Sequence, residues 1–315
     1  MAEVIKKATR EAYGEALTAI APEFPNLVVL DADLAAATKT GIFKKKYPER
    51  HIDCGIAEGN MIGVAAGLAA SGNIVFASSF AMFAAGRAFE QIRNSVAYPH
   101  LNVKIGATHA GVSVGEDGAT HQCCEDIALM RAIPGMVILN PADDVETLQA
   151  VRAAAAYNGP VYLRFGRLAV ERIFDESYHF EIGKGAQLTN GSDVTIAATG
   201  LMVGEALAAQ KLLAAEGISA RVLDIATIKP LDDALLLRAA AETGAIVTAE
   251  EHNIIGGLGS AVAELVGEHC PVPVVRVGVR DTFGKSGPAK ELLQVFGLDA
   301  AHIVEAAKRA VAMKK

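Results

Sequence analysis

The strongest constraint on the fold of this chain is an alternation of short apolar runs with longer helical patterns along its first half. The apolar runs are continuous, which is typical of strands that are buried on both faces of a sheet. Because helical patterns separate the strands, the sequence predicts βα units and a parallel sheet. The predicted strands cover residues 27–30, 74–77, 103–107, 136–139 and 161–164. The predicted helices cover residues 4–20, 58–71, 82–97, 122–132 and 143–157.

A second alternation of the same kind follows a segment, residues 169–190, that has no periodic pattern and gathers Phe, Tyr, Asp and Glu. The sequence therefore predicts an α/β fold of two domains, residues 1–168 and 191–315, joined by a linker at 169–190. Each domain is expected to be a mainly parallel sheet covered by helices on both faces. The predicted strands of the second domain lie near residues 193–198, 220–224, 245–249 and 273–277. Its predicted helices lie near residues 202–216, 232–242, 257–268, 288–295 and 301–312.

The composition argues against several classes of protein. A net charge of −7 over 315 residues argues against a nucleic-acid surface, which needs clustered Lys and Arg, and the basic run at residues 44–46 is too short to change this. The first residues contain no apolar signal core and the chain contains no apolar run of about 18 residues, so we expect a cytoplasmic location. The four cysteines include the adjacent pair Cys123 and Cys124, and their spacing predicts neither a disulfide framework nor a zinc site.

Two segments concentrate the side chains that can do chemistry. Residues 55–61, Gly-Ile-Ala-Glu-Gly-Asn-Met, place a single acid, Glu58, at the start of an apolar helix. On its own, such a carboxylate could simply stabilise the positive end of the helix. Residues 108–122, Thr-His-Ala-Gly-Val-Ser-Val-Gly-Glu-Asp-Gly-Ala-Thr-His-Gln, place two histidines and two carboxylates between glycines. Tight turns would explain the glycines but not the histidines.

Together these two segments resemble the pyrimidine-binding half of transketolases, which use thiamine diphosphate. The resemblance extends over nearly the whole chain, because residues 224–230, 249–253 and 282–287 are similar to the transketolase C-terminal domain. It implies a pyrimidine-binding domain followed by that C-terminal domain. For Glu250, Glu251 and His252 of the second domain we expect a hydrogen-bonded cluster at the domain interface, since buried polar groups need partners.

The resemblance implies which residues bind the cofactor. Glu58 corresponds to the glutamate that hydrogen-bonds the aminopyrimidine ring and so helps the cofactor lose its reactive proton. Phe83 matches the position that stacks on this ring, and Phe80 matches a neighbouring pocket wall, although both could be ordinary core residues. Asp33 is also assigned to cofactor binding. A further aromatic residue of the family pattern is replaced by Ala77.

The substrate residues are assigned in the same way. His109 corresponds to a histidine that contacts the sugar phosphate, and Asp117 to an acid that bonds a substrate hydroxyl. His121 is expected beside the reacting carbon, where an imidazole can move protons near neutral pH. Arg10 and Arg167 match phosphate-binding arginines, whose guanidinium forks suit phosphate oxygens.

One departure affects this phosphate site. Ala37 stands where the family usually has a phosphate-contacting serine, and Thr38 or Lys39 could substitute for it. The departure leaves open how tightly the phosphate is bound and which donor is used.

The resemblance also implies a partner chain. The Gly-Asp-Gly string and downstream Asn that bind the diphosphate and the metal in transketolases are not found in these 315 residues. We therefore expect an N-terminal transketolase subunit to contribute that site and its Mg²⁺ or Ca²⁺, with no metal ligand on this chain. Self-association through a central dimer would then give a heterotetramer.

The expected activity is transfer of a two-carbon ketol unit from a ketose phosphate to an aldose phosphate. Three alternatives stay open at this point: half of an enzyme like deoxyxylulose-phosphate synthase, a β subunit of a 2-oxoacid dehydrogenase, and a non-catalytic subunit that stabilises a partner. The first shares the Thr-His-Ala-Gly and Gly-Ala-Thr-His-Gln strings, and the second is divided into chains in a similar manner.

Overall fold

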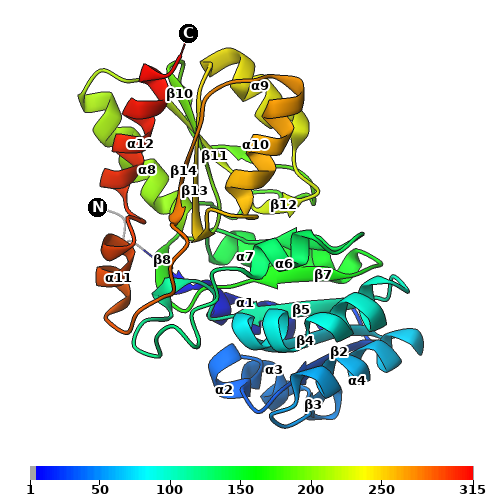
Figure 1. Ribbon diagram of the computed structural model, residues 1–315. Coiled ribbons are helices and arrows are strands. Elements are labelled where there is room, and N and C mark those ends of the chain that lie inside the picture. The colour runs from blue at the N-terminus through cyan, green and yellow to red at the C-terminus, as the bar shows by residue number, and fades with distance from the viewer. Residues whose placement is uncertain (1–4, 315) are drawn as a thin grey trace.

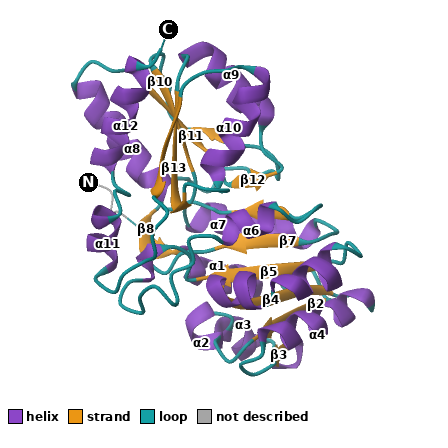
Figure 2. Cartoon of the chain, in the orientation of Figure 1, coloured by secondary structure: helices purple, strands orange, loops and turns teal. Residues whose placement is uncertain are grey.

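The computed structural model describes residues 5–314 and places two β-sheets one above the other, each flanked by helices (Figure 1). The start of the first predicted helix, at Val4, and the outermost ends of both predicted domains lie outside the described residues. Helices lie on both faces of each sheet, as the colouring by secondary structure makes clear (Figure 2). The predicted α/β class is confirmed. Within residues 5–314, no helix is both long and apolar enough to cross a membrane.

The first sheet has seven strands in the order β12-β6-β7-β5-β4-β2-β3, and all neighbours are parallel except β12 and β6. Its strands are β2 (Leu27–Asp31), β3 (His51–Asp53), β4 (Ile74–Phe80), β5 (Val103–Thr108), β6 (Val137–Leu139), β7 (Val161–Arg164) and β12 (Thr227–Lys229). Its helices are α1 (Thr9–Ile20), α2 (Ala35–Thr38), α3 (Gly41–Lys46), α4 (Glu58–Ala70), α5 (Phe89–Gln91), α6 (Asp126–Arg131) and α7 (Asp144–Ala156). Along β4, Val75 and Ala77 belong to one apolar cluster and Phe76 belongs to another, so both faces of the strand are buried.

The second sheet has five strands in the order β14-β13-β10-β11-β9, parallel except for β9. Its main strands are β10 (Val194–Ala198), β11 (Ala220–Asp224), β13 (Ile246–Asn253) and β14 (Val274–Val279). Its helices are α8 (Met202–Ala215), α9 (Asp233–Thr243), α10 (Leu258–His269), α11 (Ala289–Val295) and α12 (Ala300–Ala312). Helices α8 and α12 cover one face, and α9 and α10 cover the other (Figure 1).

Short strands connect the two halves of the chain. β1 (Lys6–Ala8) pairs antiparallel with β8 (Ala169–Glu171), and β9 (Ala186–Gln187) pairs antiparallel with β11. Residues 169–190, predicted as a linker, therefore contain two strands. In addition, β12 comes from the second half of the sequence but forms the edge of the first sheet. The two domains thus share backbone hydrogen bonds as well as side-chain contacts.

Three predicted helices differ in the structure. The first begins at Thr9, because residues 6–8 form β1. Residues 82–97 contain two π-helical segments, Met82–Arg87 and Ile92–Ala97, on either side of α5. Residues 122–125 precede α6 as a loop. In this loop the side-chain amide of Gln122 donates to the carbonyl groups of Val112, Gly115 and Lys285.

Candidate active site

The predicted site residues follow the carboxyl ends of several parallel strands of the first sheet. Phe80 ends β4, His109 follows β5, and Arg167 lies three residues after the end of β7. Parallel strands have their carboxyl ends at one edge of the sheet, and ligands of open α/β sheets bind there. Arg10 reaches the same edge from the first turn of α1, where its backbone N–H donates to the Gly166 carbonyl at 3.3 Å.

Glu58 is the first residue of α4, and its side chain is only 1% exposed. Arg87 Nη1 donates to Glu58 Oε2 at 2.7 Å, and Ser79 Oγ donates to Glu58 Oε1 at 3.5 Å. The Arg87 guanidinium also lies 4.7 Å from the centroid of the Phe83 ring. The carboxylate therefore has one strong partner, and this partner covers the aromatic ring next to it.

A row of rings continues from Phe83. The Phe83 and Phe80 centroids are 5.8 Å apart, and Phe80 stacks on His109 at 3.8 Å. His121 meets the Phe83 ring edge to face at 5.2 Å. Its Nδ1 is 3.0 Å from the Thr120 hydroxyl. These contacts bring together four of the predicted residues around one flat apolar surface that a planar heterocycle could share.

His109 is held as a neutral imidazole. Burial, followed by the charges of Arg10 and Arg167, lowers its pKa to about 3. Its Nε2 is 2.9 Å from Arg10 Nη1, and its Nδ1 is 2.9 Å from Thr108 Oγ1. Because a guanidinium can only donate, Nε2 accepts and the proton is on Nδ1, which donates to Thr108. His109 also has a positive φ of 57°, a conformation that recurs at functional sites.

Arg10, Arg167 and Asp117 form a charged group beside His109. Arg10 Nη1 also donates to the Ala37 carbonyl at 3.0 Å, while Arg10 Nε is buried without a hydrogen-bond partner among the described residues. Arg167 Nη1 donates to the Val114 carbonyl at 2.7 Å and to Asp117 Oδ2 at 3.1 Å. Burial and the charge of Arg167 lower the pKa of Arg10. Two neighbouring guanidiniums and an unpartnered N–H are the donor set that an anion such as phosphate requires.

The second domain positions the loop that carries these residues. Glu251 Oε1 accepts the Ser113 N–H at 2.6 Å. Gly111 has a φ of +80°, and a Cβ there would lie 2.2 Å from the Glu251 carboxyl carbon. Burial raises the pKa of Glu251 to about 7, against the lowering effect of Arg164. On the far side of the loop, α11 packs against residues 112–114.

The expected polar cluster at the domain interface is confirmed. Glu250 accepts the N–H groups of Leu258 and Gly259 at 2.7 and 2.8 Å. His252 Nε2 accepts the Ala128 N–H at 3.3 Å. These bonds place the start of α10 and a turn of α6 against the same strand, β13.

Asp33 follows the carboxyl end of β2, at the same edge of the sheet as Phe80 at the end of β4. Its side chain is exposed, its φ is 58°, and its N–H donates to Asp53 Oδ1 at 3.0 Å. Among the described residues, no hydrogen bond or ion pair joins it to Glu58, the aromatic rings or the arginines. Sequence reasoning missed Arg87, although its position four residues after Phe83 was a usable signal, since such residues share a helix face.

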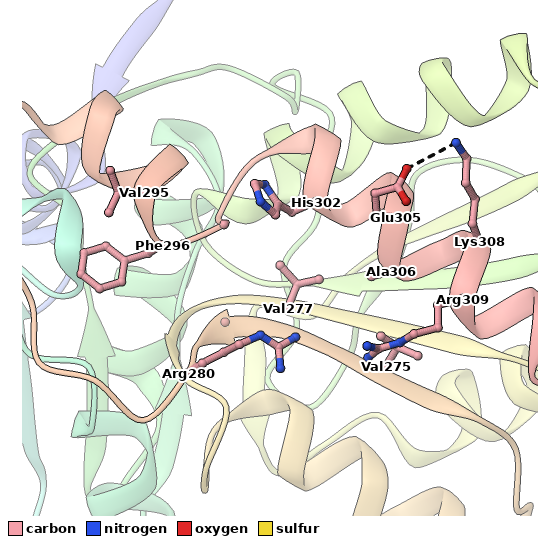
Figure 3. Close-up of a pocket in the computed structure, with 12 residues that line it drawn as sticks. Val275, Val277, Arg280, Val295, Phe296, His302, Glu305, Ala306, Lys308 and Arg309 are labelled. Carbon is pink, nitrogen blue, oxygen red and sulfur yellow. Dashed lines mark hydrogen bonds and ion pairs between the residues drawn. The ribbon is translucent and has the colours of Figure 1, made fainter.

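One cavity in the structure lies next to the site, and another lies in the second domain. The first, of about 460 Å³, is lined by Met82, Gln122 and Phe283. The second, of about 580 Å³, lies between β14 and α12 and contains none of the predicted site residues (Figure 3). In that second cavity the Arg280 and Arg309 side chains point toward each other above the strand. Over residues 5–314, no group of three or more His, Cys, Asp or Glu side chains is arranged to bind a metal ion.

Comparison with known proteins identifies the two domains. Residues 5–172 match the family described as "Transketolase, pyrimidine binding domain", and residues 183–303 match "Transketolase, C-terminal domain". A solved split-gene transketolase, described as an inactive β4 tetramer, is 55% identical with a TM-score of 0.92. That match covers 98% of this chain and 99% of the other.

Two further relatives differ in how much of their own length this chain covers. A 6-deoxy-6-sulfo-D-fructose transketolase subunit of Clostridium sp. (strain MSTE9) is 49% identical over 95% of this chain and 92% of its own length. Transketolase of Homo sapiens is 39% identical over 96% of this chain, but over only 49% of its own length. The resemblance inferred from the sequence is confirmed: the chain belongs to the transketolase family and contains its pyrimidine-binding and C-terminal domains.

Proposed function

We propose that this chain is the C-terminal subunit of a two-chain, thiamine-diphosphate-dependent transketolase. The enzyme moves a two-carbon ketol unit from a ketose phosphate to an aldose phosphate. The observation that carries the proposal is a row of contacts in which Arg87 binds Glu58 and lies over Phe83, and Phe80, His109 and Arg10 follow in turn. The row joins a buried carboxylate, flat apolar faces and anion donors in one site. The division into domains at residues 168 and 191 and a cytoplasmic location are part of the same proposal.

The residues present fit the pyrimidine end of thiamine diphosphate. Glu58 is buried in apolar surroundings, where a hydrogen bond to a ring nitrogen is electrostatically stronger than in water. Phe83 and Phe80 offer flat faces for a heterocycle. Asp33, whose side chain is exposed just after β2, is assigned to the same cofactor site. When bound, thiamine diphosphate supplies the nucleophilic carbon for transfer of the two-carbon unit, while the protein orients and activates it.

The substrate is held from the opposite end of the row. Arg10 and Arg167 bind the sugar phosphate, and the unpartnered Arg10 Nε gives that binding a free donor. His109 is neutral, so its part is to hold Arg10 through Nε2 rather than to add a charge. Asp117 bonds a sugar hydroxyl. His121, beside Phe83, donates a hydrogen bond to the substrate carbonyl oxygen and transfers a proton to or from that oxygen during the reaction.

A second chain completes this site. Two exposed apolar side chains border the site: Ile56, two residues before Glu58, is 77% exposed, and Phe283, at the neighbouring cavity, is 87% exposed. A partner chain that covered these side chains would bury their apolar surface. The partner is an N-terminal transketolase subunit that brings the diphosphate-binding residues and Mg²⁺ or Ca²⁺. Pairing of two such units through a central dimer gives a heterotetramer.

The test is ketol transfer by the assembled enzyme. The chain is mixed with the N-terminal subunit, thiamine diphosphate and Mg²⁺, and mass spectrometry follows the products of xylulose 5-phosphate and ribose 5-phosphate. Because one relative is named for a sulfofructose substrate, the sulfonated donor is tested in parallel. Glu58→Gln should lower turnover by about a hundredfold or more, whereas the exposed Glu49→Gln control should match the wild type. Full turnover by the Glu58 variant would contradict the proposal.

A further inference from the structure

Arg87 connects two groups that the proposed function reserves for the cofactor. It ends the π-helical segment Met82–Arg87, and its side chain is 53% exposed. Its guanidinium donates to Glu58 Oε2 at 2.7 Å and lies 4.7 Å from the Phe83 ring centroid. A solvent-exposed arginine therefore reaches into the site and contacts its most buried acid.

The guanidinium resembles the cofactor ring in the two contacts that it makes. It is planar, it donates N–H groups to a carboxylate, and it can lie over an aromatic face. In the proposed function, the aminopyrimidine makes the same two contacts, a hydrogen bond with Glu58 and a stack on Phe83. Two planar groups cannot occupy one position between the same carboxylate and the same ring.

We propose that Arg87 is a placeholder for the aminopyrimidine: it occupies the contacts on Glu58 and Phe83, and cofactor binding displaces it into solvent. This inference rests on the proposed function of the site. Arg87 is therefore a positioning residue, because Arg87 acts on the orientation of the Glu58 side chain and not on the substrate.

The burial of Glu58 explains why such a placeholder is useful. A buried carboxylate is strongly unfavourable without a charged or hydrogen-bonding partner. The other donor to Glu58, Ser79 Oγ, is 3.5 Å away, at the limit of a hydrogen bond. Arg87 thus supplies the charged partner that holds the Glu58 side chain in place.

The position of Arg87 makes its displacement physically reasonable. About half of its side chain is already in water, so leaving the site costs little new exposure. Gly86 precedes it, and the segment is wound as a π-helix, a geometry that is frequent at functional sites. The displaced guanidinium keeps its charge in solvent at no desolvation cost.

The first test measures whether Arg87 and Glu58 are coupled in the full chain. Thermal unfolding is compared for the wild type, Arg87→Ala, Glu58→Gln and the double variant. We expect Arg87→Ala to lower Tm by several degrees when Glu58 is present and to have little effect in the Glu58→Gln background, since an uncharged amide needs no counter-ion. An equal loss of Tm in both backgrounds would show that Arg87 only supports the fold.

The second test measures thiamine diphosphate binding by calorimetry, with the chain assembled with its N-terminal subunit. Because a competing internal group reduces the apparent affinity, Arg87→Ala should bind the cofactor roughly tenfold more tightly than the wild type. Arg93→Ala, which removes an exposed arginine of the next π-helical segment, Ile92–Ala97, should leave Kd unchanged.

The outcomes of the second test distinguish a failure of the placeholder role from a failure of the proposed function. Arg87→Lys keeps a charge near Glu58 without the planar stack, so its Kd should lie between those of the wild type and Arg87→Ala. An unchanged or weaker affinity in Arg87→Ala would overturn the placeholder role. If the wild-type assembly bound no thiamine diphosphate at all, the proposed function itself would fail instead.

Discussion

The contact between Asp224 and Glu146 should make the stability of this protein depend on pH in a specific direction. Glu146 belongs to α7 of the first domain, and Asp224 ends β11 of the second. Glu146 accepts hydrogen bonds from the Tyr178 hydroxyl at 2.6 Å and the Ala142 N–H at 2.8 Å. Within the described residues, neither oxygen of Asp224 has a donor. Two buried carboxyl groups can pair only if one of them keeps its proton.

The sign of the pH effect follows from this shared proton. Burial and then the charge of Glu146 raise the pKa of Asp224 well above its ordinary value, and burial raises the pKa of Glu146 to about 7. The folded protein therefore retains a proton that the unfolded chain releases above about pH 4. One extra bound proton lowers the free energy of unfolding by about 1.4 kcal/mol for each unit of rising pH. The free energy of unfolding should therefore fall as the pH rises from about 5 to about 8, for as long as the folded pair keeps its proton.

Asp224→Asn removes this proton and keeps a side chain that can donate to Glu146. Its free energy of unfolding should therefore gain on the wild type as the pH rises over that interval, by up to about 1.4 kcal/mol for each pH unit. Urea denaturation of both proteins across the interval measures the difference directly. Asp233→Asn, an exposed acid on α9, should run parallel to the wild type. Parallel curves for Asp224→Asn would mean that the pair is ionised in the folded protein, and the reasoning would be refuted.

Three further predictions concern the site itself. Arg167→Ala should lower kcat/KM for phosphorylated donors about tenfold to a hundredfold, which corresponds to the loss of one charge-assisted hydrogen bond. Turnover of hydroxypyruvate should stay nearly constant, and equal losses on both donors would rule out the phosphate role. Gly111→Ala should lower Tm strongly, because its Cβ would collide with Glu251 and its φ is +80°, and a variant with unchanged Tm would show that the loop is not held by Glu251. Since the pKa of His109 is about 3, ¹⁵N spectra should show it neutral, with the proton on Nδ1, down to about pH 5; an imidazolium signal at pH 6 would contradict the arrangement around Arg10.

The central part of the fold was predictable from local pattern. Continuous apolar runs identified β2, β4, β5, β6 and β7, because strands buried on both faces need no alternation. The strand β12 was not predictable, since its partner β6 lies far away in sequence and belongs to the other domain. The π-helical segments were also missed, because the periodicity of the sequence does not distinguish them from an α-helix.

The residues of the site that lie in sequence motifs were predictable. The sequence placed Glu58, the two phenylalanines and the two histidines in one site. In the structure the four rings contact one another, and Glu58 joins them through Arg87. The neutral state of His109 was not foreseen, because it depends first on burial in the folded protein and then on the charge of Arg10, which is 99 positions away in sequence. The pairing of Arg87 with Glu58 depends in the same way on the winding of a helical segment.

The most direct test of the account is turnover with and without the second subunit. The purified chain, shown by mass spectrometry to contain no other polypeptide, is supplied with thiamine diphosphate, Mg²⁺, xylulose 5-phosphate and ribose 5-phosphate. The account predicts no ketol transfer by this chain alone and full transfer after the N-terminal subunit is added. Robust turnover by the chain alone would contradict the claim that the active site is built between two chains.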